Sequence, residues 1–333
     1  MKTDQLQPEI NGATQCPFHH GAPLAEAEPD SPQQEFAAAR SVKVDRADSP
    51  RFGILLVNHG SHSATWRRML LDVQAQVQSE LLAIPNVQSV RTGFMEYTEP
   101  SIATQLRAFD DDGVDHILIV PLLLTISNHS FDDIPTICGL KDDPDVIESL
   151  RKEKIERYRP QAEIDITPLL DYPKLVRKNL ARRLESLRES GCESAECPFR
   201  DGCVLVGYGS AEYNDQWEAF FRELGDFTVE ELGAVAATCS WCGHIVKYKS
   251  GPTSKAIREI LGSADRALVV PILVAYDEMF QGRIIGRAIR EVGEPERILY
   301  KADAILPEPE VERWVVTIVK DRIEDALRAT PIA

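Results

Sequence analysis

Hydrophobic runs alternate with segments of helical periodicity from about residue 51 onward. The run at 52–57 is continuously apolar and ends at Asn-His-Gly-Ser (58–61), a pattern typical of a buried strand that stops at a tight turn. Apolar residues then recur at helical spacing from Trp66 to Leu82, until Pro85 interrupts them. The pattern predicts a strand, a turn and a helix.

The same alternation continues through the first half of the chain. Further strands are predicted at 87–95, 117–124 and 164–167, and further helices at 102–109, 146–158 and 175–187. A long loop is expected after the strand at 117–124. Strands that alternate with helices indicate a parallel sheet with right-handed crossovers.

The second half repeats this order. A strand at 203–206 leads into Gly-Tyr-Gly-Ser (207–210), and Val-Pro-Ile-Leu-Val at 270–274 is similar to Val-Pro-Leu-Leu-Leu at 120–124. The repeat is far longer than the repeats of solenoid proteins. We therefore predict an α/β fold of two similar domains, each a parallel sheet flanked by helices, related by internal duplication.

Composition suggests where these domains begin and end. Residues 1–50 are rich in Pro, Glu, Ala and Gln without a sustained apolar period, which is typical of a flexible tail. The first domain is predicted at 51–190 and the second at 203–333. Residues 191–202 form a linker of small and charged residues that also contains cysteine.

Charge and hydropathy narrow the class of protein. The 333 residues carry 53 acidic and 37 basic side chains, a net charge of −16, which disfavours binding to nucleic acid. Apolar runs are far shorter than the ~20 residues that span a bilayer, so no membrane partner is expected. The polar start lacks the apolar core of a secretory signal, and we expect a cytoplasmic protein with mostly reduced cysteines.

Candidate chemistry lies just after the predicted strands of the first half. His59 follows the first strand, Glu96 the second and His129 the third. Ligands of open parallel sheets bind beyond the carboxyl ends of the strands. Two imidazoles and a carboxylate there suit a divalent metal and also accept protons. The alternative is that each is a hydrogen-bonded loop residue.

Three motifs carry a resemblance to a known family. They are Leu-Val-Asn-His-Gly-Ser at 56–61, Gly-Phe-Met-Glu at 93–96 followed by Glu-Pro-Ser-Ile at 99–102, and Pro-Leu-Leu-Leu at 121–124 with His129 and Asp-Ile-Pro at 133–135. In this order they resemble the sirohydrochlorin cobaltochelatase family of class II tetrapyrrole chelatases. The resemblance covers about residues 51–187. One departure is Ser127, where glycine is expected.

The resemblance implies insertion of a divalent metal into sirohydrochlorin or a related tetrapyrrole, without ATP or another nucleotide, in a cleft between two similar domains. It places cobalt first as the metal substrate, with nickel or iron as alternatives. His59 and His129 would hold the metal and take protons from the macrocycle, and Glu96 would assist. The alternatives are a porphyrin ferrochelatase and a non-catalytic carrier of metal or tetrapyrrole. Monomer and homo-oligomer both remain open.

The second half lacks an equivalent histidine pair. Tyr208 occupies the position of His59 and Met279 that of His129, so one active centre per chain is expected. Ser61, Tyr208 and Arg283 are candidate substrate-binding residues, the arginine for the acidic side arms of a tetrapyrrole. A solvated helix face is the alternative for Arg283.

Cysteines form a second candidate site. A Cys-x-x-Cys and a nearby histidine are formed by Cys239, Cys242 and His244, and a second group by Cys192, Cys197 and Cys203. An iron–sulfur cluster that draws on both groups is one hypothesis. A mononuclear or redox cysteine pair and unligated reduced thiols are the others.

Overall fold

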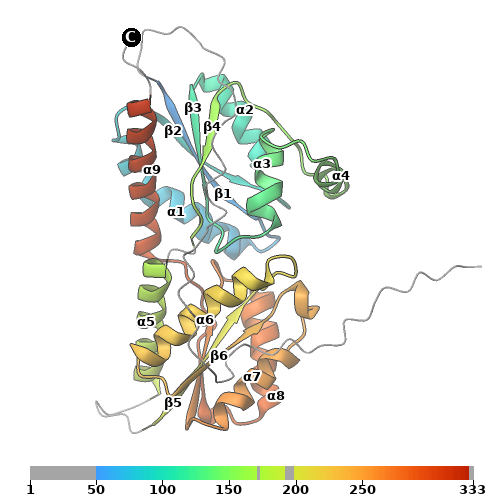
Figure 1. The fold of residues 1–333 in the computed structure, drawn as a ribbon, viewed down its shortest axis with the longest axis vertical. Coiled ribbons are helices and arrows are strands. Elements are labelled where there is room, and N and C mark those ends of the chain that lie inside the picture. The colour runs from blue at the N-terminus through green and yellow to red at the C-terminus, as the bar shows by residue number, and fades with distance from the viewer. Residues whose placement is uncertain (1–49, 171–172, 192–198, 330–333) are drawn as a thin grey trace, which may run out of the picture.

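The computed structural model describes residues 50–170, 173–191 and 199–329. It contains two four-stranded parallel sheets, ordered β2-β1-β3-β4 and β6-β5-β7-β8, with helices packed on their faces (Figure 1). The identical strand order confirms the predicted α/β fold of two similar halves. Residues 1–49 of the tail predicted at 1–50, and two of the candidate cysteines, Cys192 and Cys197, lie outside the described residues.

The elements of each half follow one another in the same order. The first half comprises β1 (Phe52–Asn58), α1 (Ala64–Leu82), β2 (Val87–Phe94), α2 (Ile102–Asp112), β3 (His116–Pro121), the π-helical turn η2 (His129–Asp133), α3 (Ile134–Ile137), α4 (Pro144–Glu153), β4 (Glu163–Ile166) and α5 (Pro173–Ser190). The second comprises β5 (Asp201–Gly207), α6 (Asn214–Glu230), β6 (Ala236–Trp241), the 3-10 turn η3 (His244–Val246), α7 (Gly251–Leu261), β7 (Arg266–Pro271), the π-helical η4 (Glu278–Ile285), α8 (Gly286–Val292), the 3-10 turn η5 (Pro295–Arg297), β8 (Ile298–Tyr300) and α9 (Pro309–Ala329).

The first sheet is built around β1, every residue of which is buried. Its side chains alternate between the two faces of the sheet, as the period of a strand requires. Ile54 and Leu56 join the core that α1 covers, whereas Leu55 and Val57 join the core that α2 and α3 cover. The residue pairs Asn58–Phe94 and Val57–Pro121 show that β1, β2 and β3 end at one edge. The loops after these strands therefore start side by side.

Two predicted elements end several residues earlier in the structure. The strand predicted at 117–124 ends at Pro121, and the loop predicted after it contains η2 and α3. The helix predicted at 146–158 ends at Glu153, because Lys154 adopts a left-handed backbone with φ of 62° and closes the helix. Hydrophobic spacing beyond that residue belongs to an irregular segment that packs on the core.

The last helix of each half packs against the other half. Helix α5 contacts β7, β8 and α6, and helix α9 contacts α1 and β3. Figure 1 shows α9 alongside α1 in the first half and α5 alongside the second sheet. Buried residues of both helices, such as Leu180 and Val315, belong to one continuous core. The two halves are thus joined by an exchange of helices as well as by the chain itself.

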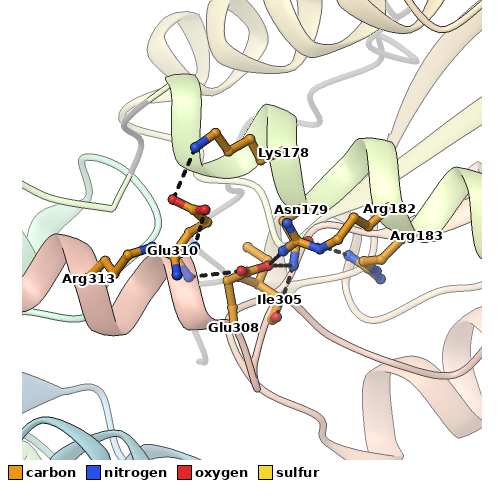
Figure 2. Close-up of polar contacts among 8 residues, drawn as sticks. All are labelled: Lys178, Asn179, Arg182, Arg183, Ile305, Glu308, Glu310 and Arg313. Carbon is orange, nitrogen blue, oxygen red and sulfur yellow. Dashed lines mark hydrogen bonds and ion pairs between the residues drawn. The ribbon is translucent and has the colours of Figure 1, made fainter.

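A polar network holds the two exchanged helices together where they meet (Figure 2). Glu308, which is 1% exposed, precedes α9 and accepts a hydrogen bond from the backbone N–H of Glu310 (2.9 Å). Its carboxylate also accepts from Nδ2 of Asn179 (2.6 Å) and pairs with Arg182, both on α5. A buried carboxylate is costly without such donors. The network therefore fixes where the chain crosses between the halves.

None of the described helices combines the length and the apolar character needed to cross a membrane.

Candidate active site

Three side chains converge at the carboxyl edge of the first sheet. His59 follows β1, Glu96 follows β2, and His129 opens η2 after β3. Their candidate ligand atoms all lie within 4.8 Å of one another, and the two imidazole centroids are 4.6 Å apart. In the part of the chain that the structure describes, no other group of three or more His, Cys, Asp or Glu is arranged to hold a metal ion. The three residues suggested by their positions after the strands come together.

Pairing beyond the strand ends sets His59 beside Glu96. The backbone N–H of Met95 donates to the carbonyl of Asn58, and that of Glu96 donates to the carbonyl of His59, both at 2.8 Å. Gly60 follows with φ of +97°, and a Cβ built on it would lie 2.1 Å from the carbonyl oxygen of Glu96. Only glycine combines this backbone angle with this close approach.

The turn that carries His129 is closed by two serines. The hydroxyl of Ser130 accepts from the N–H of Ser127 (2.9 Å) and donates to the carbonyl of Ser127 (3.0 Å). Ser127 is not among the residues with positive φ in the described chain. The glycine expected at this position is therefore not required by the backbone.

Both histidines present Nε2 to the site because Nδ1 is already used. Nδ1–H of His59 donates to the carbonyl of Gly60 (3.0 Å), and Nδ1–H of His129 donates to the carboxylate of Asp133 (2.8 Å). Such partners fix the tautomer and ring orientation of a metal-binding imidazole. Burial, and then the neighbouring His129, lower the pKa of His59 below its ordinary value of 6.5. A neutral His59 with a free Nε2 is thus favoured at pH 7.

Carboxylates surround the imidazole pair. Partial burial, followed by the hydrogen bond with Glu96, raises the pKa of the Tyr97 hydroxyl to about 12. Burial and then the charges of Glu96 and Asp133 raise the pKa of Glu153 at the end of α4. Two ligand atoms bound to one dication at about 2.1 Å lie at most about 4.2 Å apart. The ligand atoms of His59, Glu96 and His129 lie within 4.8 Å of one another. A movement of less than about 1 Å therefore lets all three bind one ion.

The second half faces this site with an aromatic cluster. The ring centroid of Tyr208 lies 5.5 Å from that of Phe280 and 5.4 Å from that of His244. The hydroxyls of Tyr208 and Tyr248 are 3.4 Å apart. Tyr248 is also close enough to Tyr97 for its charge to affect the pKa of that residue. The cluster therefore lies across from the histidine site.

Three large apolar side chains are exposed around the site. They are Tyr97 (56%), from the loop that carries Glu96, and Tyr248 (43%) and Met279 (42%) from the second half. The loop of Met279 reaches the first half, since the hydroxyl of Ser61 donates to Asp277 at 3.0 Å. Exposed apolar groups on facing loops are typical of a site for a largely apolar ligand.

Comparison with known proteins identifies the family. The sequence model of the CbiX family matches residues 53–187. A sirohydrochlorin cobaltochelatase of Saccharolobus islandicus is 30% identical over 132 residues, which are 40% of this chain and 92% of the relative. The chain belongs to the CbiX family. A sirohydrochlorin cobaltochelatase of Saccharolobus solfataricus is 28% identical to this chain, again over 132 residues, which are 40% of this chain and 92% of the relative.

Solved structures extend the likeness over both halves. The sirohydrochlorin chelatase SirB from Bacillus subtilis subspecies spizizenii, in complex with cobalt, has a TM-score of 0.56 at 16% identity and covers 83% of this chain and 96% of its own. SirB from Bacillus subtilis with Fe³⁺ has a TM-score of 0.61 at 16% identity and covers 85% and 100%. At this identity the likeness shows the fold, namely the two-domain architecture of chelatases. The resemblance to a family of tetrapyrrole chelatases, enzymes of the lyase class, is confirmed.

The three candidate substrate-binding residues of this CbiX family member lie in different surroundings. Tyr208 follows β5 as His59 follows β1, and it belongs to the facing aromatic cluster. Ser61 lies beside the site but is hydrogen-bonded to Asp277. Arg283 is exposed on η4, and its role as a substrate-binding residue stays a prediction.

The candidate cysteines that the structure describes have buried side chains. Cys239 is disulfide-bonded, and its side chain lies in the core that also contains Cys203. Cys242 lies in a different core, and burial raises the pKa of its thiol to about 12, as it does for Cys203. His244 contacts Tyr208. The iron–sulfur hypothesis also requires Cys192 and Cys197, and it stays a prediction.

Asp133 belongs to a motif that carried the family resemblance, but the sequence interpretation gave it no role at the site. Its spacing of four residues from His129 was a usable signal, but it fell in a segment interpreted as a loop. Residues of the second half that contact the His129 turn, above all Trp217, were also missed, because their spacing in a helix indicates only a buried face.

Substitution Asp133→Asn is expected to weaken Co²⁺ binding and metal insertion by about 10- to 100-fold, as is usual for the hydrogen-bond partner of a ligating histidine. The amide lacks the charge that orients Nδ1–H of His129. Asp132→Asn is the matched control, since Asp132 pairs with Lys141 at 3.2 Å instead. Co²⁺ titration and initial rates would measure both variants, and equal effects in the two would contradict the role of Asp133.

Proposed function

We propose that this protein inserts a divalent metal ion into sirohydrochlorin or a closely related tetrapyrrole without ATP, with cobalt as the first candidate metal. The observation that carries the proposal is the convergence of His59, Glu96 and His129 with both Nε2 atoms available, in a member of the CbiX family. The names of its relatives support sirohydrochlorin as the macrocycle.

The chemistry requires ligands that bind a hydrated dication and then release it. Neutral imidazole and carboxylate accept cobalt, nickel and iron and leave coordination positions open. Thiolate would hold these ions more tightly. In this proposal His59 and His129 bind the metal through Nε2 and release it to the pyrrole nitrogens.

Metalation also releases two protons for each dication that enters the ring. The lowered pKa of His59 keeps it neutral as a ligand. Glu96, which is hydrogen-bonded to Tyr97, lies within reach of the same centre to accept one proton, and Nε2 of His129 can accept the other once the metal has passed to the ring. Proton removal and metal delivery then occur on the same side of the macrocycle.

The facing half supplies surfaces that suit a flat ring. Tyr97 of the first half and Tyr248 and Met279 of the second half are exposed, and Tyr208 and Phe280 lie next to Tyr248. Aromatic and thioether groups pack well on the π-face of a macrocycle. This arrangement supports a cleft between the two halves as the tetrapyrrole site.

The test is metalation of sirohydrochlorin followed by absorbance, with Co²⁺, Ni²⁺ and Fe²⁺ compared at equal concentration and a porphyrin as the alternative macrocycle. We expect many turnovers per chain with sirohydrochlorin and the highest initial rate with Co²⁺. Metalation that stops at one equivalent per chain would instead indicate a carrier, and a preference for porphyrin with iron would indicate a ferrochelatase.

A further inference from the structure

The turn that carries His129 is held by the second half of the chain. Before it, the carbonyl of Ile126 accepts a hydrogen bond from the indole N–H of Trp217 at 3.1 Å. Directly before it, Nδ2 of Asn128 donates to the carboxylate of Glu212. Within it, the ring of Phe131 lies 6.3 Å from that of Tyr213.

All three contacts originate at the beginning of α6. Tyr213 directly precedes the helix and Trp217 lies in its first turn, where its backbone N–H donates to the carbonyl of Tyr213 at 3.1 Å. Trp217 is 6% exposed and packs against Phe221 and Trp241, at centroid distances of 6.1 and 6.0 Å. Its indole is therefore held rigidly by the core of the second half, and so is the N–H that contacts Ile126.

The first half holds the internal geometry of this turn. Ser130 closes the turn onto Ser127, Lys141 donates to the carbonyl of Phe131 at 2.6 Å and pairs with Asp132, and Nδ1–H of His129 donates to Asp133. The hydrogen bond to Asp133 orients the ring of His129, and because the side chain is 35% exposed, the position of the ring depends on where the turn itself lies. A ligand must be held to within about 0.5 Å for a metal site to be effective. The contacts from the beginning of α6 constrain where the turn lies.

We propose that Trp217, assisted by Glu212, is a positioning residue for His129, so that the second half completes the metal-binding geometry of the first. The proposal rests on the proposed function in that it assigns His129 to metal binding. It explains why a half without its own histidine pair remains part of the site: it orients a ligand that the other half provides.

The experiment measures Co²⁺ affinity by visible absorbance on the full chain, without any tetrapyrrole. Trp217→Phe keeps an aromatic ring but removes the N–H, and we expect Co²⁺ binding to weaken about tenfold, the lower end for loss of a supporting contact. Trp241→Phe is the matched control, because it makes the same truncation in the same aromatic cluster without a bond to Ile126. Its Co²⁺ affinity should stay within about twofold of the wild type.

A second pair of variants changes polar side chains that are not part of the hydrophobic core. Glu212→Ala removes the acceptor of Asn128 at an exposed position just before α6, whereas Glu218→Ala removes the half-buried acceptor of Asn214 within α6 (2.8 Å). We expect a loss of Co²⁺ affinity of about threefold for Glu212→Ala and none for Glu218→Ala, with equal urea midpoints for the two. This pair decides the question if Trp217→Phe does not fold.

The kinetic readout separates positioning from general destabilisation. Trp217→Phe should raise the KM for Co²⁺ while leaving the KM for sirohydrochlorin within about twofold, a split that a merely structural role would not produce. Unchanged Co²⁺ affinity in both Trp217→Phe and Glu212→Ala, or no Co²⁺ binding by the wild type, overturns the proposal. Wild-type Co²⁺ binding that depends on Trp217 but supports no metalation would overturn the proposed function alone.

Discussion

Substitution His129→Ala is expected to lower the rate of metal insertion by about 10²- to 10⁴-fold, the range usual for loss of a positioned proton-transfer group. The variant loses one of the two Nε2 atoms that face the site and leaves Asp133 without its imidazole partner. Because His129 is 35% exposed, the free energy of unfolding should change by less than about 1 kcal/mol. The effect therefore appears in turnover and not in folding.

The control for this variant is His62→Ala. His62 is an exposed imidazole whose ring centroid lies 4.5 Å from that of Tyr97, close to the site but outside the group of three. We expect its rate of metalation to stay within about threefold of the wild type. Initial rates of cobalt insertion at saturating sirohydrochlorin measure both. If His129→Ala turns over like His62→Ala, His129 is not part of the reaction centre.

The site residues were accessible from sequence because their placement follows a local rule. A buried run such as β1 ends where polar residues begin, and parallel strands end at a common edge. His59, Glu96 and His129 could therefore be brought to one place without knowledge of how the halves pack. The same rule places Tyr208 at the matching edge of the second sheet.

Features that depend on long-range packing could not be obtained in this way. The apolar stripe of α5 predicts that one face is buried, but nothing in its period tells which sheet covers it. The structure places it on β7 and β8, while α9 packs on α1. Trp217 likewise occupies an ordinary core position of α6. Its indole N–H donates to the carbonyl of Ile126 in the other half, and the sequence alone does not indicate how the two halves face each other.

The π-helical turns η2 and η4 show why the duplicated halves differ in chemistry. Both turns follow a strand that ends in proline, and they carry His129 and Met279 at matching positions. Both halves have the same backbone framework, whereas only the first has an imidazole at this position. In the second half, the same backbone turn carries the apolar side chain of Met279 where the first half has a metal ligand.

Substitution Gly60→Ala is expected to damage stability and chemistry together. The residue has φ of +97°, and an added Cβ would lie 2.1 Å from the backbone oxygen of Glu96. The left-handed backbone costs about 1–2 kcal/mol for alanine, and forcing apart packed atoms costs about 1–3 kcal/mol more. We therefore expect the free energy of unfolding to fall by about 2–5 kcal/mol.

The same displacement moves two of the three site residues. The carbonyl of His59 accepts from the N–H of Glu96 at 2.8 Å, so a shift of the Glu96 backbone carries both residues with it. A misplacement of about 1 Å is enough to lower a rate about 10²-fold. Metalation by folded Gly60→Ala should fall by at least that factor.

Gly233→Ala separates backbone strain from this collision. Gly233 also has a left-handed backbone, with φ of +70°, but a Cβ there would meet nothing within 4 Å. We expect this variant to lose only about 1–2 kcal/mol and to metalate at the wild-type rate. Urea unfolding and initial metalation rates, measured below the onset of unfolding, test both variants. Similar stability and activity in the two would mean that the close approach of Gly60 to Glu96 does not hold the site together.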